Sequence, residues 1–154
     1  MQEAEQLDRF FEICRQHNLK ITPQRTSVYH ALMSAENHPS ADDIFQIVKH
    51  QYPNITFDTV NRTLMTFTQI GLLTIVESYR GSRRFDPNFE DHHHMHCLKC
   101  GRIVDFTSDE FDQLKAPKKL MQKFATVLSS RVIFNGICLE CQNKTDKFYR
   151  NNKS

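Results

Sequence analysis

The stretch that decides the fold is FDTVNRTLMTFTQIGLLTIVESYRGSRRF, residues 57–85. Apolar residues recur at intervals of three and four from Val60 to Ile70, which predicts a helix with one buried face. Gly71 is typical of a helix end. Two extended segments, 72–76 and 82–85, then flank a turn around Gly81. A helix followed by a β-hairpin predicts the reading helix and wing of a winged helix-turn-helix.

Three further helices are predicted upstream of this stretch. The first covers about 5–17 and carries an apolar stripe that includes Cys14, which we interpret as a core residue. A second starts after Thr22 with proline at its first position and runs to about residue 33. The third follows the capping-box pattern Ser40-Ala41-Asp42-Asp43 and stops at Pro53.

Polar and basic side chains on the reading helix and hairpin suit contacts with bases and phosphates. The net charge of +2 decides little, so a DNA surface must come from local clustering. Two other interpretations stay open: a solvated helix beside an ordinary basic turn, and a module that contacts another protein. The candidate DNA-contacting residues are Arg25, Thr59, Asn61, Arg62, Thr63, Arg80, Arg83 and Arg84.

The second half predicts a different, mixed architecture, so we expect an α+β chain of two domains. Residues 1–85 form the winged-helix domain, 86–90 a hinge, and 91–154 a small α/β dimerisation domain. The elements expected in the last domain are strands at 92–98, 102–106 and 130–136, a helix from 108 to about 124 interrupted at Pro117, and a terminal helix at 139–150.

Two matched C-x-x-C pairs predict a closed tetrahedral zinc site. A C-x-x-C turn points both sulfurs the same way, and two such turns supply four thiolates. Because no coordination position stays open, we assign this zinc to structure rather than catalysis. The ligands are Cys97, Cys100, Cys138 and Cys141.

The run His92-His93-His94-Met95-His96 predicts a second metal site, because the four thiolates saturate the first. In an extended chain His92 and His94 share a face and His93 points the other way. Imidazoles with carboxylates suit iron, manganese or zinc. A polar strand with scattered histidines is the alternative.

The bulk composition indicates a soluble protein. No apolar run approaches the ~18 residues that span a bilayer, and the N-terminus lacks the pattern of a secretory signal. The five cysteines are odd in number and arranged for metal, so we expect a reducing, cytoplasmic location.

Motifs along most of the chain resemble the ferric uptake regulator family, and are most similar to its peroxide-responsive branch. The matching stretches are Ile21-Thr22-Pro23-Gln24-Arg25, residues 38–44, Arg84-Phe85-Asp86, residues 91–94, residues 97–106, and the cysteine pair after Gly136.

This resemblance implies a homodimeric repressor that binds a double-stranded DNA operator when a regulatory Fe(II) or Mn(II) ion is bound. In the peroxide-responsive branch, iron-catalysed oxidation of a ligating histidine relieves repression, an oxidative-stress response. The resemblance places the regulatory ligands at His38, Asp86, His92, His94 and Asp105. The residues expected to be oxidised are His38 and His92.

Three residues depart from the family pattern, and one of them, Arg62, keeps an iron-responsive repressor open as the alternative. Asn61 replaces a tyrosine of the reading helix, and Arg62 resembles the iron-regulator branch. Ser130 replaces a histidine of an additional metal site, to which His93, His96 and Glu110 remain candidate contributors. An iron oxygenase or metallohydrolase fits less well, because five protein ligands leave little room for substrate. We therefore expect no enzyme activity.

Overall fold

The structure is a computed structural model that describes residues 2–35, 38–76, 81–88 and 90–144. The chain divides into two compact units, Met1–Phe89 and Glu90–Ser154. Within the described residues, no helix is long and apolar enough to cross a membrane. Arg80, a predicted DNA contact, lies outside the described residues, as do 145–150 of the predicted terminal helix, whose described part is helical from 139 to 144.

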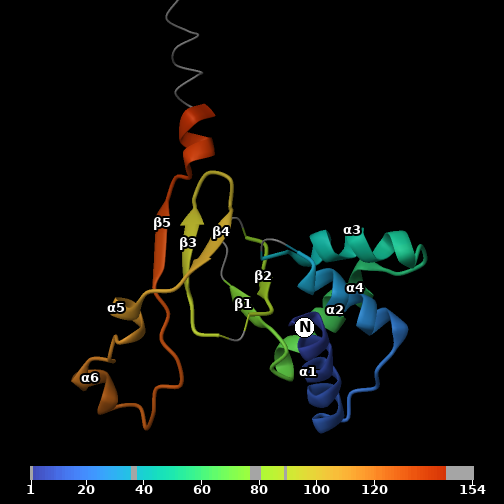
Figure 1. The fold of residues 1–154 in the computed structure, drawn as a ribbon, viewed down its shortest axis with the longest axis horizontal. Coiled ribbons are helices and arrows are strands. Elements are labelled where there is room, and N and C mark those ends of the chain that lie inside the picture. Colours follow the sequence, from blue (N-terminus) through green and yellow to red (C-terminus); the bar gives the residue numbers. More distant parts are fainter. Residues whose placement is uncertain (1, 36–37, 77–80, 89, 145–154) are drawn as a thin grey trace, which may run out of the picture. The chain divides into compact units, whose positions relative to one another are not determined.

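The first unit is a helical bundle with a small hairpin, as predicted (Figure 1). Helices α2, α3 and α4 pack on one another. The helices are α1 (Gln2–Gln16), α2 (Pro23–Met33), α3 (Ala41–Gln51) and α4 (Phe57–Gln69).

Local hydrogen bonds at the helix ends explain why the boundaries follow the sequence signals. The Thr22 hydroxyl accepts from the Arg25 backbone N–H, at 3.3 Å, and caps α2. Ser40 and Asp43 form the predicted capping box of α3. At the end of α4, Gly71 has φ 77°, and the N–H groups of Gly71 and Leu72 donate to Thr68 and Phe67. This paired closure is the Schellman motif, whose left-handed position is usually occupied by glycine.

The core of the first unit is aromatic and aliphatic. Phe10 of α1 stacks on Tyr29 of α2, with ring centroids 4.4 Å apart, and meets Phe67 of α4 edge-on at 5.7 Å. Cys14 is buried in the same core, and this burial raises the pKa of its thiol. The interpretation of Cys14 as a packing residue is therefore confirmed.

The hairpin consists of β1 (Thr74–Val76) and β2 (Arg84–Asp86), which pair antiparallel. Strand β1 begins two residues later than predicted. The Leu72 N–H donates to the Phe67 carbonyl at the end of α4, and the Leu72 side chain packs into the core. Asp86 ends strand β2, whereas the sequence placed it at the start of the hinge. A backbone bond from Phe85 N–H to the Pro39 carbonyl, 2.9 Å, ties β2 to the segment before α3.

The second unit is built on a three-stranded sheet of order β4-β3-β5 (Figure 1). The sheet contains β3 (His93–Cys97) at its centre, with β4 (Ile103–Phe106) antiparallel and β5 (Ile133–Gly136) parallel to it. The β3–β4 hairpin was predicted. The parallel pairing brings Cys97 level with Gly136, so the segments that follow both strands lie at the same sheet edge.

The helical segment predicted from residue 108 to about 124 is interrupted at Pro117, as predicted, but its two parts are shorter than predicted. The structure has two single turns instead, α5 (Asp109–Asp112) and α6 (Lys118–Met121). Neither turn buries a residue, so packing, apart from the ring contacts of Phe111, adds little to the weak stability of short helices. Pro117 supplies no backbone N–H to connect them.

Candidate functional site

The four cysteines of the second unit form one cluster, as their spacing predicted. Cys97 ends β3 and Cys100 follows it, while Cys138 and Cys141 follow β5, the parallel neighbour of β3. Their sulfur atoms all lie within 4.8 Å of one another, and the Cys100 and Cys138 sulfurs are 3.8 Å apart. A tetrahedron with metal–sulfur bonds of about 2.3 Å has edges of about 3.8 Å. The cysteine cluster thus fits a tetrahedral zinc ion.

The pKa values of the thiols in the cysteine cluster also favour a bound cation. Backbone N–H groups of Cys100 and Cys138 lower the pKa of Cys97 to about 5. The side chain of Cys138, together with burial, raises the pKa of Cys141 to about 12. Cys97 therefore ionises readily, whereas hydrogen bonding and burial oppose ionisation of Cys141. A divalent cation removes that opposition and lets all four sulfurs ligate.

Arg102 and Glu140 connect the two cysteine turns independently of the sulfurs. Both terminal nitrogens of Arg102 donate to the two oxygens of Glu140, each at 3.0 Å. This pairing lowers the pKa of the Glu140 carboxyl. Lys99 donates to the Cys141 carbonyl as well, at 3.3 Å. Residues between the cysteines thus help to hold the turns in register.

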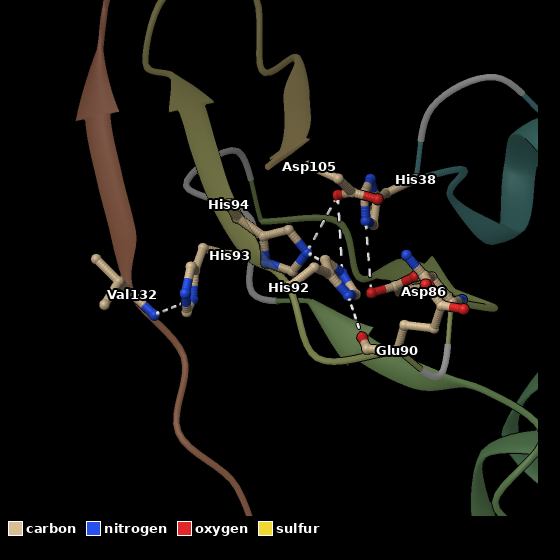
Figure 2. A network of polar contacts seen from close by, with 9 residues as sticks. His38, Asp86, Glu90, His92, His93, His94, Asp105 and Val132 are labelled. Atoms are coloured by element: carbon tan, nitrogen blue, oxygen red, sulfur yellow. Dashed lines mark hydrogen bonds and ion pairs between the residues drawn. The ribbon is translucent and has the colours of Figure 1, made fainter. Parts of the chain in front are cut away.

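The second unit also gathers two histidines and a carboxylate, which we call the histidine cluster (Figure 2). The Nε2 atoms of His92 and His94 are 3.0 Å apart, and Asp105 Oδ1 lies 3.8 and 3.4 Å from them. Strand pairing explains the arrangement, because His94 lies opposite Asp105 across β3 and β4. Ligands about 2.1 Å from a metal and at right angles are about 3 Å apart. These donors therefore fit the coordination sphere of a divalent ion.

The backbone fixes which nitrogen of His92 can bind a metal. His92 Nδ1 lies 2.6 Å from the Glu90 carbonyl oxygen (Figure 2). A carbonyl accepts only, so Nδ1 must carry the proton, and Nε2 of the neutral ring presents its lone pair. In metal sites generally, a hydrogen bond donated by the non-ligating ring nitrogen orients the histidine ligand.

The first unit holds the other two predicted ligands side by side. His38 Nε2 lies 3.6 Å from Asp86 Oδ2, and the Asn88 N–H donates to Asp86 Oδ1 at 2.8 Å. Arg84 steadies the His38 segment by donating to the His38 carbonyl, 3.2 Å, and to Asp43, 3.4 Å. We call these two ligands the His38–Asp86 pair.

His93 faces away from the histidine cluster, as alternation along the strand predicted. The Val132 N–H donates to His93 Nδ1 at 3.2 Å (Figure 2). The ring proton therefore sits on Nε2, which faces Asp112 Oδ1 at 3.0 Å. The ring packs against Phe106 and Phe111. His93 therefore joins β3 to the segments around it, and Asp112, rather than Glu110, is its acidic neighbour.

The exposed face of α4 and the start of α2 border a polar hollow of about 420 Å³. Four of the predicted DNA contacts line it: Arg25, Thr59, Arg62 and Thr63. Arg83 lies against the same helix, with Nη1 3.6 Å from the Met65 sulfur. Asn61 is partly exposed on α4.

Two of the predicted DNA contacts are engaged inside their own unit. Thr63 is buried, and its hydroxyl donates to the Thr59 carbonyl at 2.8 Å. Arg84 is occupied by the His38 carbonyl and Asp43. Thr63 lies on the buried face of α4. The path of the chain before α3 places the His38 carbonyl within hydrogen-bonding distance of Arg84.

Sequence reasoning missed three residues that the structure places at these sites. Asp112 contacts His93 across elements, and Glu140 pairs with Arg102 over a separation of 38 residues. No sequence signal announces either partner. Asp58 pairs with Arg62 at a spacing of four, with Nε and Oδ2 3.0 Å apart, and this helical spacing was a signal that could have found it.

Comparisons with known proteins agree on one family. A family model described as the ferric uptake regulator family matches residues 16–135. The peroxide-responsive repressor PerR of Staphylococcus aureus is 34% identical over 139 residues, which cover 90% of this chain and 93% of the relative. The peroxide stress regulator of Campylobacter jejuni has a similar structure, with a TM-score of 0.63 and 28% identity over 85% of this chain and 98% of that one. The Helicobacter pylori ferric uptake regulator shares the fold, with a TM-score of 0.73 and 24% identity over 90% and 93% of the chains.

Proposed function

The chain belongs to the ferric uptake regulator family, and from that premise we propose that it is a metal-dependent repressor that senses peroxide through oxidation of a histidine ligand. At the level of the family, the protein is a metal-responsive transcriptional regulator and not an enzyme. The observation that carries the metal-dependent part of this proposal is the histidine cluster, in which the Glu90 carbonyl presents His92 Nε2 beside His94 and Asp105. The peroxide-sensing part is supported by the 34% identity to the peroxide-responsive repressor PerR.

A structural zinc ion binds the four sulfurs of the cysteine cluster. The support is the near-tetrahedral sulfur spacing and the low pKa of Cys97, about 5, which supplies a first thiolate near neutral pH. Zinc holds the ends of β3 and β5 together and thereby stabilises the second unit.

The regulatory ion, Fe(II) or Mn(II), takes its ligands from both units. His38 and Asp86 belong to the first unit, and the histidine cluster belongs to the second. Within each unit the donors already lie near one another, which reduces the cost of ordering them on binding. An ion that binds best when all five donors converge shifts the population toward that geometry. We assign DNA binding to this geometry.

Bound Fe(II) would catalyse cleavage of the O–O bond of hydrogen peroxide, and the two electrons that reduce the peroxide would come from a C–H bond of the imidazole ring. One peroxide oxygen is added to the imidazole carbon of a ligating histidine, and the other leaves as water. His38 and His92 are the residues we propose to be modified. An oxidised ring is a poorer ligand, so the five-donor geometry loses stability and DNA is released.

Arg62 supports the second candidate, an iron-responsive repressor of the same family that does not sense peroxide. Its guanidinium is exposed on α4, where the peroxide-responsive branch often has asparagine. The two candidates share the metal ligands and differ in their response to peroxide.

Metal-dependent binding to duplex DNA is the direct test of the regulator function. Adding Mn(II) to metal-free protein should raise its affinity for a duplex selected from a random pool by roughly 5- to 150-fold, the usual range of allosteric coupling. Asp105→Ala should abolish the increase, while Asp109→Ala, a change of equal charge on α5, should leave it intact. Equal affinities with and without metal would refute the proposal.

A homodimer is supported by the apolar surface of the second unit. The described residues of this unit expose several large apolar side chains, including Phe124, Leu128, which is 92% exposed, and Phe134. Large apolar side chains that stay exposed in one unit favour burial against a second copy of the chain.

Replacing one of these exposed apolar side chains with a charged residue should therefore break the dimer. Leu128→Asp and Phe134→Asp should shift the protein toward monomer in analytical ultracentrifugation, because a charge cannot be buried unpaired. Ile47→Asp, on α3 of the first unit, is the matched control and should leave the dimer intact. Two second-unit variants that sediment as the wild type would place the interface elsewhere.

A further inference from the structure

An acidic residue lies on the helix face proposed to read DNA. Asp58 stands in the first turn of α4, one turn before Arg62, and their side chains are 67% and 80% exposed. Asp58 Oδ2 lies 3.0 Å from Arg62 Nε. Both residues line the polar hollow that Arg25 and Thr59 also border.

This pair does little for the stability of the helix. Exposed ion pairs one turn apart stabilise helices weakly and are screened by salt. On a DNA-binding face the carboxylate also repels phosphates, so it lowers affinity for every duplex. A contribution to sequence discrimination would offset that cost.

The contact engages one edge of the guanidinium and leaves the other edge available. Asp58 approaches Nε, and within the described part of the chain neither terminal nitrogen of Arg62 has a protein partner. An arginine whose two terminal nitrogens point outward in a fixed plane matches the O6 and N7 acceptors of guanine in the major groove.

We propose that Asp58 is a specificity-determining residue that holds Arg62 in position to read a guanine. This role rests on the proposed DNA-binding function. An unrestrained arginine rotates toward the nearest phosphate and binds all sequences alike. The carboxylate of Asp58 competes with phosphates for the guanidinium and orders the side chain before DNA arrives. Asp58 is thus a positioning residue, and the base contact is made by Arg62.

The test compares discrimination with affinity in the Mn(II)-loaded, full-length protein. The probes are a duplex selected from a random pool by the wild type and a scrambled duplex of equal composition. Arg62→Ala should reduce the affinity ratio between them by roughly 5- to 150-fold, the value of one bidentate base contact. Asp58→Ala and the isosteric Asp58→Asn should reduce the same ratio while raising affinity for the scrambled duplex.

Salt dependence and a double variant add two readouts that a merely structural role would not move. With Asp58→Asn, Arg62 of each protomer gains a phosphate contact, so the slope of log affinity against log salt should steepen by about 0.9 per bound protomer. The double variant Asp58→Ala/Arg62→Ala should discriminate no worse than Arg62→Ala alone, because Asp58 acts through Arg62. Asp42→Ala, the same charge change on α3, should keep the wild-type ratio.

Unchanged discrimination in both Asp58 variants, or additive losses in the double variant, overturns the role of Asp58 alone. A wild type that discriminates no duplex from any other overturns the proposed function, and the Asp58 role with it.

Discussion

Replacing Cys97 or Cys138 with serine should release the structural zinc and unfold the second unit. The principal buried apolar cluster of the described residues lies entirely in the first unit, from Phe10 to Phe85. In the second unit, the buried apolar side chains of the described part are Cys97, Ile103 and Cys141. A unit with so little core depends on its metal, and a structural zinc contributes on the order of 10 kcal/mol of apparent binding free energy.

Zinc content by elemental analysis, together with thermal unfolding followed by circular dichroism, measures this effect. Cys14→Ala is the control, because Cys14 lies in the core of the first unit and should keep full zinc stoichiometry despite some loss of stability. A Cys97→Ser protein that stays folded and dimeric without zinc would contradict the structural role of the cluster.

Peroxide should abolish operator binding by the Fe(II)-loaded protein and leave the Mn(II)-loaded protein unaffected. Both ions hold the five donors together, but Mn(II) does not readily transfer the electrons that cleave peroxide. The loss should match the affinity gained on metal binding, roughly 5- to 150-fold. Electrophoretic mobility shifts with the selected duplex, before and after micromolar peroxide, measure it.

Asp105→Glu refines this prediction. Asp105 lies opposite His94 on the neighbouring strand, and its carboxylate is 3.4 Å from His94 Nε2. A longer arm keeps a carboxylate ligand but changes its approach, so metal-dependent DNA binding should persist while inactivation by peroxide slows. Equal inactivation rates for the variant and the wild type would show that this carboxylate does not set the reactivity.

The helical half of the fold could be predicted because its signals are local. Thr22, Ser40 and Gly71 each announce a helix end through a hydrogen bond or a backbone angle that depends on adjacent residues. The cysteine cluster was equally accessible, because C-x-x-C spacing carries its own geometry and two copies suffice.

Features that depend on long-range pairing could not be predicted. The parallel alignment of β3 with β5 brings together the segments that follow the two strands, and no local sequence pattern encodes this alignment. Asp112 lies beside His93 because the fold brings the segment after β4 next to β3. From the sequence, Arg84 was predicted to be an exposed basic residue of the wing. In the structure, the path of the chain before α3 places the His38 carbonyl within hydrogen-bonding distance of it.

The histidine cluster lies between these cases. Alternation along an extended chain correctly separated His92 and His94 from His93. The Glu90 carbonyl, which fixes the proton on His92 Nδ1, is a backbone group and leaves no trace in the sequence.

The most direct test of the central claim is the mass of the histidine-containing peptides, measured on the samples used for DNA binding. Fe(II)-loaded protein is treated with peroxide for increasing times, then digested and analysed by mass spectrometry. The peptides of His38 or His92 should gain one oxygen atom, in proportion to the DNA binding lost, while Mn(II)-loaded protein gains none. Unmodified histidines with full operator affinity after peroxide would contradict peroxide sensing and leave the iron-responsive repressor as the function.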